Sequence, residues 1–108
     1  MTGKEVWRLA NKARMKSPDL FTAYEKVTDE VYRDRALSRK NKRLMSLAIA
    51  VKEGCESCIV AQTDWALESG ASVEEILETG EVAISMGGTR GMSDNLKLLR
   101  YLEELGLV

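Results

Sequence analysis

The chain contains no histidine, one proline and two cysteines among its 108 residues. The absence of histidine excludes Ser-His-Asp hydrolysis, Cys-His proteolysis and histidine-ligated zinc or iron within one chain. Two thiols cannot complete a four-thiolate zinc site unless a second subunit contributes. The groups most readily tuned to ionise near neutral pH are therefore the two cysteines, together with any strongly shifted carboxylate or lysine.

Long hydrophobic runs are also absent. No apolar stretch reaches the roughly 18 residues of a membrane span, and the N-terminal residues have no apolar stretch of signal-peptide length. We therefore expect a cytoplasmic protein with no membrane partner. Hydrophobic residues make up 44% and charged residues 31%, which favours a folded chain, and the length predicts one domain over residues 1–108.

Proline and glycine are distributed as in an all-α fold of about six helices. Pro18 is the only proline, and no stretch alternates apolar and polar residues over the length of a strand. We expect helices over residues 4–16, 18–33, 39–53, 55–69, 73–86 and 94–105, with a flexible turn over 87–91 and an N-cap at Ser93. The apolar positions from Leu20 to Val31 are expected to face the core. Gly80 is expected to mark the close approach of a neighbouring helix.

Charge is unevenly distributed along the chain. Residues 1–44 carry 12 basic and 6 acidic side chains, and residues 45–108 carry 4 and 11. We interpret this asymmetry as two halves that face each other, within the chain or between subunits. The basic cluster over residues 39–43 could indicate nucleic-acid binding, but the net charge of −1 and the lack of a recognition motif argue against it.

Cys55 and Cys58 carry the strongest chemical signal. They follow Gly54 at the predicted start of a helix, where free N–H groups and the helix dipole stabilise a thiolate. Their spacing allows a disulfide, so one sulfur can attack an oxidant or a disulfide and the other can resolve the product. We expect Cys55 to be the more exposed. The alternatives are two buried structural thiols or a metal site shared between subunits.

Gln62 and Arg43 are the neighbours that could modify these thiols. Gln62 lies one helical turn after Cys58, where it can form a hydrogen bond but cannot carry a proton. Arg43 would lower the pKa of a nearby thiol if its helix crosses the cysteine helix steeply. By itself, the sequence favours a solvated basic cluster for Arg43 and an ordinary polar position for Gln62.

Residues 42–59, 61–63, 66–72 and 75–78 resemble the carboxymuconolactone decarboxylase family in its alkylhydroperoxidase D-like (AhpD-like) branch. The resemblance depends on a buried helix, a Gly-Cys-x-x-Cys motif, and a second helix that ends in Gly-Ala before a capping box. It implies an all-α homotrimer or homohexamer that needs no cofactor or metal. It further implies that Cys58 attacks a peroxide, that Cys55 resolves the product, and that a lipoyl-type dithiol or thioredoxin-like reductant restores the pair.

Two positions depart from the family pattern. The pattern has a histidine where this chain has Gln62, and a glutamate where it has Arg43. In AhpD-like enzymes those two residues relay protons to the attacking cysteine. The resemblance implies that Arg43 lies near the thiols, so Arg43 and Gln62 are predicted to shape the pocket.

Three functions remain open. The leading hypothesis is a thiol oxidoreductase that acts on a small-molecule peroxide or disulfide. A lactone decarboxylase, as the family name suggests, would need a carboxylate such as Glu53, Glu56 or Glu81 as general acid or base. The third is a non-catalytic oligomeric binding domain whose site has decayed.

Overall fold

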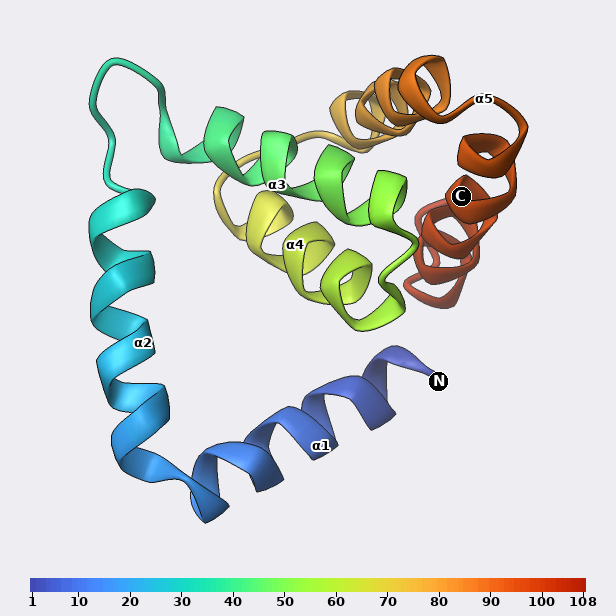
Figure 1. The fold of residues 1–108 in the computed structure, drawn as a ribbon. Helices are drawn as coiled ribbons and strands as arrows, with labels where there is room; N and C mark the ends of the chain where they lie inside the picture. The colour runs from blue at the N-terminus through green and yellow to red at the C-terminus, as the bar shows by residue number, and fades with distance from the viewer.

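The computed structural model describes residues 1–108. The chain forms helices joined by short connections and contains no strand (Figure 1). The elements are α1 (Gly3–Lys16), α2 (Pro18–Val31), α3 (Arg39–Glu53), α4 (Glu56–Glu68) and α5 (Val73–Glu104). Helix α5 is interrupted at Gly88, whose φ of 60° and ψ of −140° lie outside the helical region. The five elements therefore contain six helical segments, and the predicted all-α fold is confirmed.

The helix ends follow the local signals in the sequence. Thr2 and Ser72 each form a capping box at the start of α1 and α5, and the Ser38 side chain accepts a hydrogen bond from the Asn41 N–H. Pro18 occupies the first turn of α2, and Gly54 ends α3 in the left-handed conformation with φ of 71°. These boundaries lie within two residues of the predicted ones.

The second segment of α5 does not begin where the sequence predicts. Only Gly88 leaves the helical conformation, so Ser93 lies inside the helix and does not cap it. Gly91 is buried because the two segments of α5 pack closely, and a Cβ there would lie 3.0 Å from the Ala83 carbonyl oxygen. The expected turn is therefore present at Gly88, but it is shorter than residues 87–91, since Gly91 lies in the second helical segment and serves packing between the segments.

Helices α3, α4 and α5 form a body with the hydrophobic core between them. Helix α3 packs against both of the others. Gly80 in the first segment of α5 is buried, and a Cβ there would meet Asn95 and lie 3.3 Å from Leu98 Cδ2 in the second segment. The predicted close approach at Gly80 is therefore confirmed. The largest core cluster contains Leu47, Ala50, Val51, Ile59, Ala66, Ala71, Ile76, Ala83, Leu98 and Leu102.

Helices α1 and α2 form an arm that is attached to this body mainly through α1 (Figure 1). The Trp7 Nε1–H and the Tyr101 hydroxyl both donate to the carboxylate of Asp64, each at 2.6 Å, and so tie α1, α4 and α5 together. Helix α2 has no buried residue, and its Leu20 and Tyr24 are 66% and 63% exposed. The prediction that the apolar face of α2 meets the core is wrong within one chain, because α2 packs on α1 and stands apart from the body.

None of the helices combines the length and the apolar content needed to cross a bilayer.

Candidate thiol site

Cys55 and Cys58 lie at the junction of α3 and α4, as the sequence predicts. Gly54 ends α3 in the left-handed conformation, and Cys55 is the N-cap of α4. The Cys55 Sγ accepts a hydrogen bond from the Cys58 N–H at 3.3 Å. The two sulfurs form a disulfide whose Cα atoms are 5.2 Å apart. The structure therefore holds the oxidised form of a dithiol pair at a helix N-terminus.

The exposure of the two cysteines is the reverse of the expected order. Cys58 is exposed, whereas Cys55 is half-buried. Cys55 occupies the turn where the chain reverses from α3 into α4, so neighbouring backbone covers it. Cys58 lies on the side of α4 that faces the arm. Its sulfur is therefore the one that an external reactant can approach.

Cys58 lines a hollow of about 660 Å³ between α4 and the α1–α2 arm. The wall is mostly hydrophobic, and Arg14 and Glu25 form an ion pair of 3.1 Å that joins α1 to α2 at the hollow. We call this hollow the thiol pocket. Its hydrophobic and aromatic lining consists of Met1, Val6, Trp7, Leu9, Ala10, Phe21, Tyr24, Ala61 and Trp65.

Gln62 lines the same pocket, and Arg43 lies behind it. The Arg43 Nη1 donates a hydrogen bond to the Gln62 Oε1 at 3.3 Å. The Arg43 guanidinium carbon lies 3.4 Å from the centre of the Tyr32 ring and 4.5 Å from that of the Trp65 ring. Burial lowers the pKa of Arg43, but an arginine remains charged at neutral pH. Arg43 is therefore stacked between two rings, unlike the solvated residue that the sequence alone favours.

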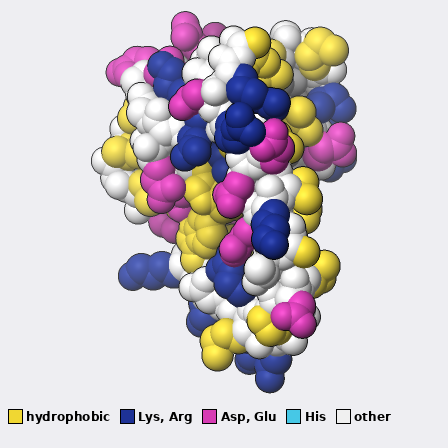
Figure 2. All heavy atoms as spheres, turned by 90° about the vertical axis from the view of Figure 1, so that its left-hand side faces the viewer, with side chains coloured by type: hydrophobic (Ala, Val, Ile, Leu, Met, Phe, Trp, Pro, Cys, Tyr) yellow, Lys and Arg dark blue, Asp and Glu magenta, His cyan; other side chains and the backbone are white.

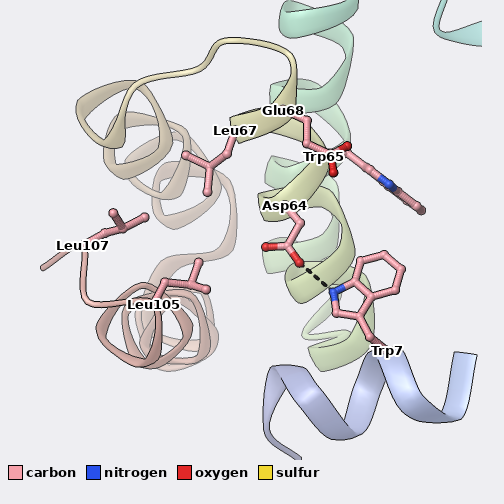
Figure 3. A pocket seen from close by; sticks show the side chains of 7 residues that line it. All are labelled: Trp7, Asp64, Trp65, Leu67, Glu68, Leu105 and Leu107. Atoms are coloured by element: carbon pink, nitrogen blue, oxygen red, sulfur yellow. Dashed lines mark hydrogen bonds between the residues drawn. The ribbon is translucent and has the colours of Figure 1, made fainter.

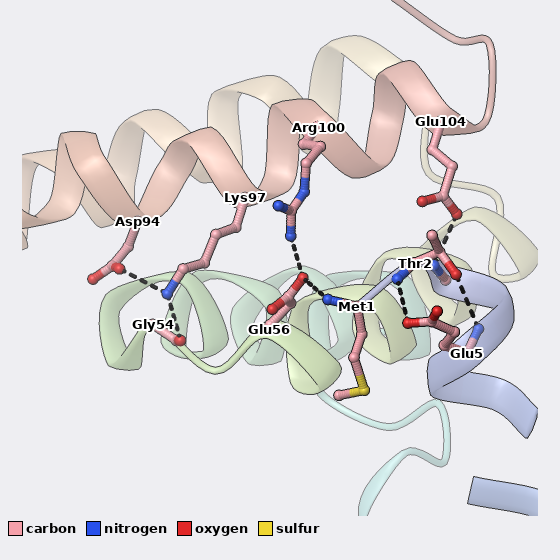
Figure 4. Close-up of polar contacts among 10 residues, drawn as sticks. Met1, Thr2, Glu5, Gly54, Glu56, Asp94, Lys97, Arg100 and Glu104 are labelled. Atoms are coloured by element: carbon pink, nitrogen blue, oxygen red, sulfur yellow. Dashed lines mark hydrogen bonds and ion pairs between the residues drawn. The ribbon is translucent and has the colours of Figure 1, made fainter. Parts of the chain in front are cut away.

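The backbone around Cys55 is held on its other side by the second segment of α5 (Figure 4). The Lys97 Nζ donates to the Gly54 carbonyl at 2.9 Å and to Asp94 at 3.1 Å, and Arg90 donates to Asp94 at 2.9 Å. Hydrogen bonds from Lys97 and Arg90 lower the pKa of Asp94. Arg100 pairs with Glu56 inside the Cys-x-x-Cys loop. These contacts brace the backbone on both sides of Cys55.

This brace was not predicted from the sequence. The spacing of Arg90, Asp94 and Lys97 at i, i+4 and i+7 could have indicated an ion-pair group on one helical face. Nothing local connects that group with Gly54, which lies 43 residues before Lys97. A Cβ at Gly54 would lie 2.9 Å from Asp94 Oδ1, so this position needs glycine for space as well as for its positive φ.

A second hollow, of about 630 Å³, lies between α1, α4 and the C-terminal residues (Figure 3). Trp7 and Trp65 line both hollows, and their rings meet edge to face with centroids 5.7 Å apart. Asp64 in this hollow is engaged by Trp7, and burial together with Asp64 raises the pKa of Tyr101. Because this second hollow contains no thiol and its Asp64 is already paired, we regard the thiol pocket as the functional candidate.

Carboxylates do not gather at either site in a way that suggests other chemistry. No group of three or more cysteine, aspartate or glutamate side chains converges as metal ligands. Glu53, Glu56 and Glu81, the candidates for decarboxylase chemistry, do not line the thiol pocket. Glu25 is the only carboxylate there, and it is paired with Arg14.

Comparison with known proteins identifies the family. The sequence profile of the carboxymuconolactone decarboxylase family matches residues 18–101. The chain belongs to the carboxymuconolactone decarboxylase family. An uncharacterised protein from Cupriavidus necator is 32% identical over 82% of this chain and 78% of its own length. An uncharacterised protein from the cox locus of Paracoccus denitrificans is 33% identical over 81% and 76%.

Solved structures of family members share the fold. A carboxymuconolactone decarboxylase family protein from Legionella pneumophila superposes with a TM-score of 0.82 at 31% identity, covering 94% of this chain and 90% of that one. A family protein from Thermotoga maritima superposes with a TM-score of 0.70 at 30% identity, covering 80% and 89%. That protein is described as having a possible part in an antioxidative response.

Proposed function

We propose that this family member is an AhpD-like thiol oxidoreductase in which Cys58 attacks a hydroperoxide and Cys55 resolves the product. The observation that carries the proposal is the exposed Cys58 sulfur in an apolar pocket, paired with Cys55 at a helix N-terminus. A purely structural disulfide would have no need of a pocket beside its exposed sulfur. The antioxidative description of the Thermotoga maritima relative supports the same chemistry.

The proposed reaction has two steps within the protein. The Cys58 thiolate attacks the distal oxygen of R–O–OH, so that an S–O bond forms as the O–O bond breaks and two electrons pass from sulfur to the peroxide. The alkoxide that leaves takes a proton from water. The Cys55 thiol then attacks the Cys58 sulfenic acid, which forms the disulfide and releases water. An external dithiol returns the pair to the reduced form.

The position of the thiols favours the ionised form that this attack requires. The reduced cysteines lie at the N-terminus of α4, where unpaired N–H groups and the positive end of the helix dipole stabilise a thiolate. Lys97 adds a positive charge at the carbonyl of Gly54, next to Cys55. We therefore propose that the thiol pKa at this site lies below the usual value of about 8.5.

The lining of the pocket indicates the class of oxidant. A hydroperoxide with an apolar organic group can bury that group against Trp7, Leu9 and Phe21, whereas hydrogen peroxide gains nothing from such a wall. We propose an organic hydroperoxide as the substrate, with a small-molecule disulfide as the alternative. Cumene hydroperoxide is expected to oxidise Cys58 faster than hydrogen peroxide does. Equal rate constants for the two peroxides would show that the pocket does not select the substrate.

The decisive experiment uses the reduced protein and the variants C58S and C55S. Reduced wild type should form the Cys55–Cys58 disulfide with cumene hydroperoxide, C58S should not react, and C55S should stop at a sulfenic acid that dimedone traps. Dihydrolipoamide and a thioredoxin system, tested separately, should identify the reductant. The proposal fails if Cys58 reacts no faster than free cysteine at the same degree of ionisation.

We also propose that a second copy of the chain covers the exposed face of α2, in a homotrimer or homohexamer. Leu20, Tyr24, Val27 and Val31 form an exposed apolar stripe at helical spacing. The view of Figure 2 looks onto this side of the molecule, where hydrophobic side chains lie among basic and acidic ones. The excess of basic residues before residue 45 and of acidic residues after it suits contact between copies. Light scattering should give a trimer or hexamer, and V27D should dissociate it.

A further inference from the structure

The Gln62 amide can present only one of its two ends to the thiol pocket. An arginine side chain has five N–H donors and no acceptor, so the group that faces Arg43 must be the Gln62 oxygen. Gln62 lines the pocket, whereas Arg43 does not. The Nε2 amino group lies opposite the oxygen that Arg43 holds. The end of the amide that remains for the pocket is therefore a hydrogen-bond donor.

Arg43 is well placed to hold the amide in this orientation. Its planar guanidinium is stacked between Tyr32, which follows α2, and Trp65 on α4. The Tyr32 hydroxyl is in turn hydrogen-bonded to Ser46 Oγ on α3 at 2.5 Å. The two rings restrict rotation of the guanidinium. A donor fixed in advance in this way does not have to be reorganised when charge develops beside it.

Gln62 and Cys58 lie on the same face of α4. Residues four apart are neighbours on the surface of a helix. Both residues line the same pocket. The amide donor and the attacking sulfur therefore border the same space, into which a hydroperoxide bound at Cys58 would place its oxygens.

We propose that Arg43 fixes Gln62 so that the amide N–H donates a hydrogen bond to the oxygen that leaves when Cys58 attacks a hydroperoxide. This inference rests on the proposed function and adds a role for each residue. Gln62 is the catalytic residue, since it contacts the substrate, and Arg43 is a positioning residue that acts through it. The donor stabilises the developing alkoxide but does not protonate it, so the proton comes from water.

The proposal has a consequence for pH dependence. An amide does not titrate in the working range, and neither does an arginine. Gln62 and Arg43 should therefore add no ionisation of their own to the pH profile of Cys58 oxidation, which should reach a plateau. The other titratable groups at the pocket are the Cys55 thiol, the Met1 amino group that pairs with Glu56, and Glu25, and their effects should be the same in wild type and in Q62M. The resemblance to AhpD-like enzymes implies a titrating relay at these two positions. The structure instead favours a fixed donor in its place.

The first test compares plateau rate constants, where Cys58 is fully ionised and differences in its pKa no longer matter. Reduced wild type, Q62M and Q62E are mixed with cumene hydroperoxide, and oxidation is followed by tryptophan fluorescence across the pH range. Loss of one donor in an enclosed oxyanion site costs about 10²–10³ in rate, so about tenfold is expected in this more open pocket. Q62E keeps the acceptor that Arg43 binds and loses the donor, but it adds a negative charge, so the uncharged variant Q62M measures the loss of the donor by itself.

The matched control is E74Q, which changes an exposed side chain in the first turn of α5, outside the pocket. It should retain the wild-type plateau. If Q62M does not fold, the uncharged variant Q62L replaces it, and Q62E, which preserves the shape of the residue and its contact with Arg43, serves as the folded comparison. A plateau within twofold of wild type in both variants overturns the inference.

The second test separates the position of Arg43 from its charge. R43K keeps the positive charge but loses the planar group that stacks between the rings. Its plateau should fall toward that of Q62M, while the Cys58 pKa stays close to the wild-type value. The double variant R43K/Q62M should be no slower than Q62M alone, because both changes remove the same donor. An additive loss in the double variant would contradict a role through Gln62.

The outcomes also distinguish this inference from the proposed function. If wild type reacts through Cys58 but the Gln62 variants are equally fast, the thiol chemistry stands and the donor role is wrong. A second ionisation that is present in wild type and abolished in Q62M has the same meaning. If wild type shows no oxidation that C58S abolishes, the proposed function fails and the inference fails with it.

Discussion

The α3–α5 body and the α1–α2 arm differ in how the apolar faces of their helices are covered. Each contains amphipathic helices with clear start and stop signals. In the body those apolar faces meet one another and bury side chains such as Leu47 and Ile76 completely. In the arm, α2 leaves Leu20 and Tyr24 mostly exposed. Hydrophobic periodicity thus identifies the apolar face of a helix, but it does not identify what covers that face.

The thiol pocket lies at the boundary between these two regions. The body supplies the disulfide and Gln62, and the arm supplies most of the apolar wall. Changes in the body should therefore affect stability and thiol chemistry. Changes in the arm should affect self-association and the binding of the organic group of the substrate.

The largest difference in the free energy of unfolding should appear when a leucine is replaced by alanine in each of the two regions. L47A removes a fully buried side chain from the core and should lower the free energy of unfolding by about 2–5 kcal/mol. L20A removes an exposed side chain and should change it by less than about 0.5 kcal/mol in the monomer. Urea denaturation of dilute protein checks both. A large, concentration-dependent loss for L20A would mean that a second copy covers α2, and comparable losses in the monomer would contradict the division into body and arm.

A smaller loss of stability is expected where α1 contacts the body. W7F keeps an aromatic ring but removes the N–H that donates to Asp64, a hydrogen bond to a charged group worth about 1.5–3 kcal/mol. Asp64 retains its hydrogen bond from Tyr101. Amide exchange should therefore accelerate in α1 and α2 while α3 and α5 remain protected. Uniform acceleration throughout the chain would show that the arm and the body unfold as one unit.

Much of the body could be predicted because its signals are local. Gly54 ends α3, Ser72 forms a capping box, and Cys55 and Cys58 lie at a helix start, all of which depend on a few adjacent residues. Even the close approach at Gly80 could be inferred from a glycine inside an apolar helical pattern. The position of Cys55 and Cys58 at a helix start could be predicted because it, too, depends on adjacent residues.

The parts that could not be predicted depend on contacts between distant segments. The position of Cys58 at the thiol pocket depends on where the arm lies, and no local pattern fixes that. The stacking of Arg43 between Tyr32 and Trp65 joins three segments of the chain. Glycine at position 91 looks like a turn signal, but its missing Cβ instead permits the two segments of α5 to pack.

Acid should weaken the body through Asp94. Hydrogen bonds and charges from Lys97 and Arg90 lower the pKa of Asp94 in the folded state. The stability it contributes is therefore complete above the unfolded-state pKa of about 3.9 and is lost as pH falls through the lowered folded-state value. D94N should lower the denaturation midpoint at pH 7 and show a smaller further fall below pH 4 than wild type. Parallel curves for the two proteins across that range would contradict this role.

The smallest expected effect is on the thiols, through Lys97. K97M removes the ammonium group that binds the Gly54 carbonyl, next to Cys55, so the pKa of the Cys55 thiol in the reduced protein should rise by a few tenths of a unit. K97R should restore most of the charge effect, while the longer, planar side chain should fit the Gly54 carbonyl less well. Alkylation rates of the reduced protein across pH give this pKa. Because Lys97 belongs to the body, L20A in the arm should leave that pKa unchanged. An equal shift in L20A would show that the arm, as well as α5, determines the electrostatics of the thiol pair.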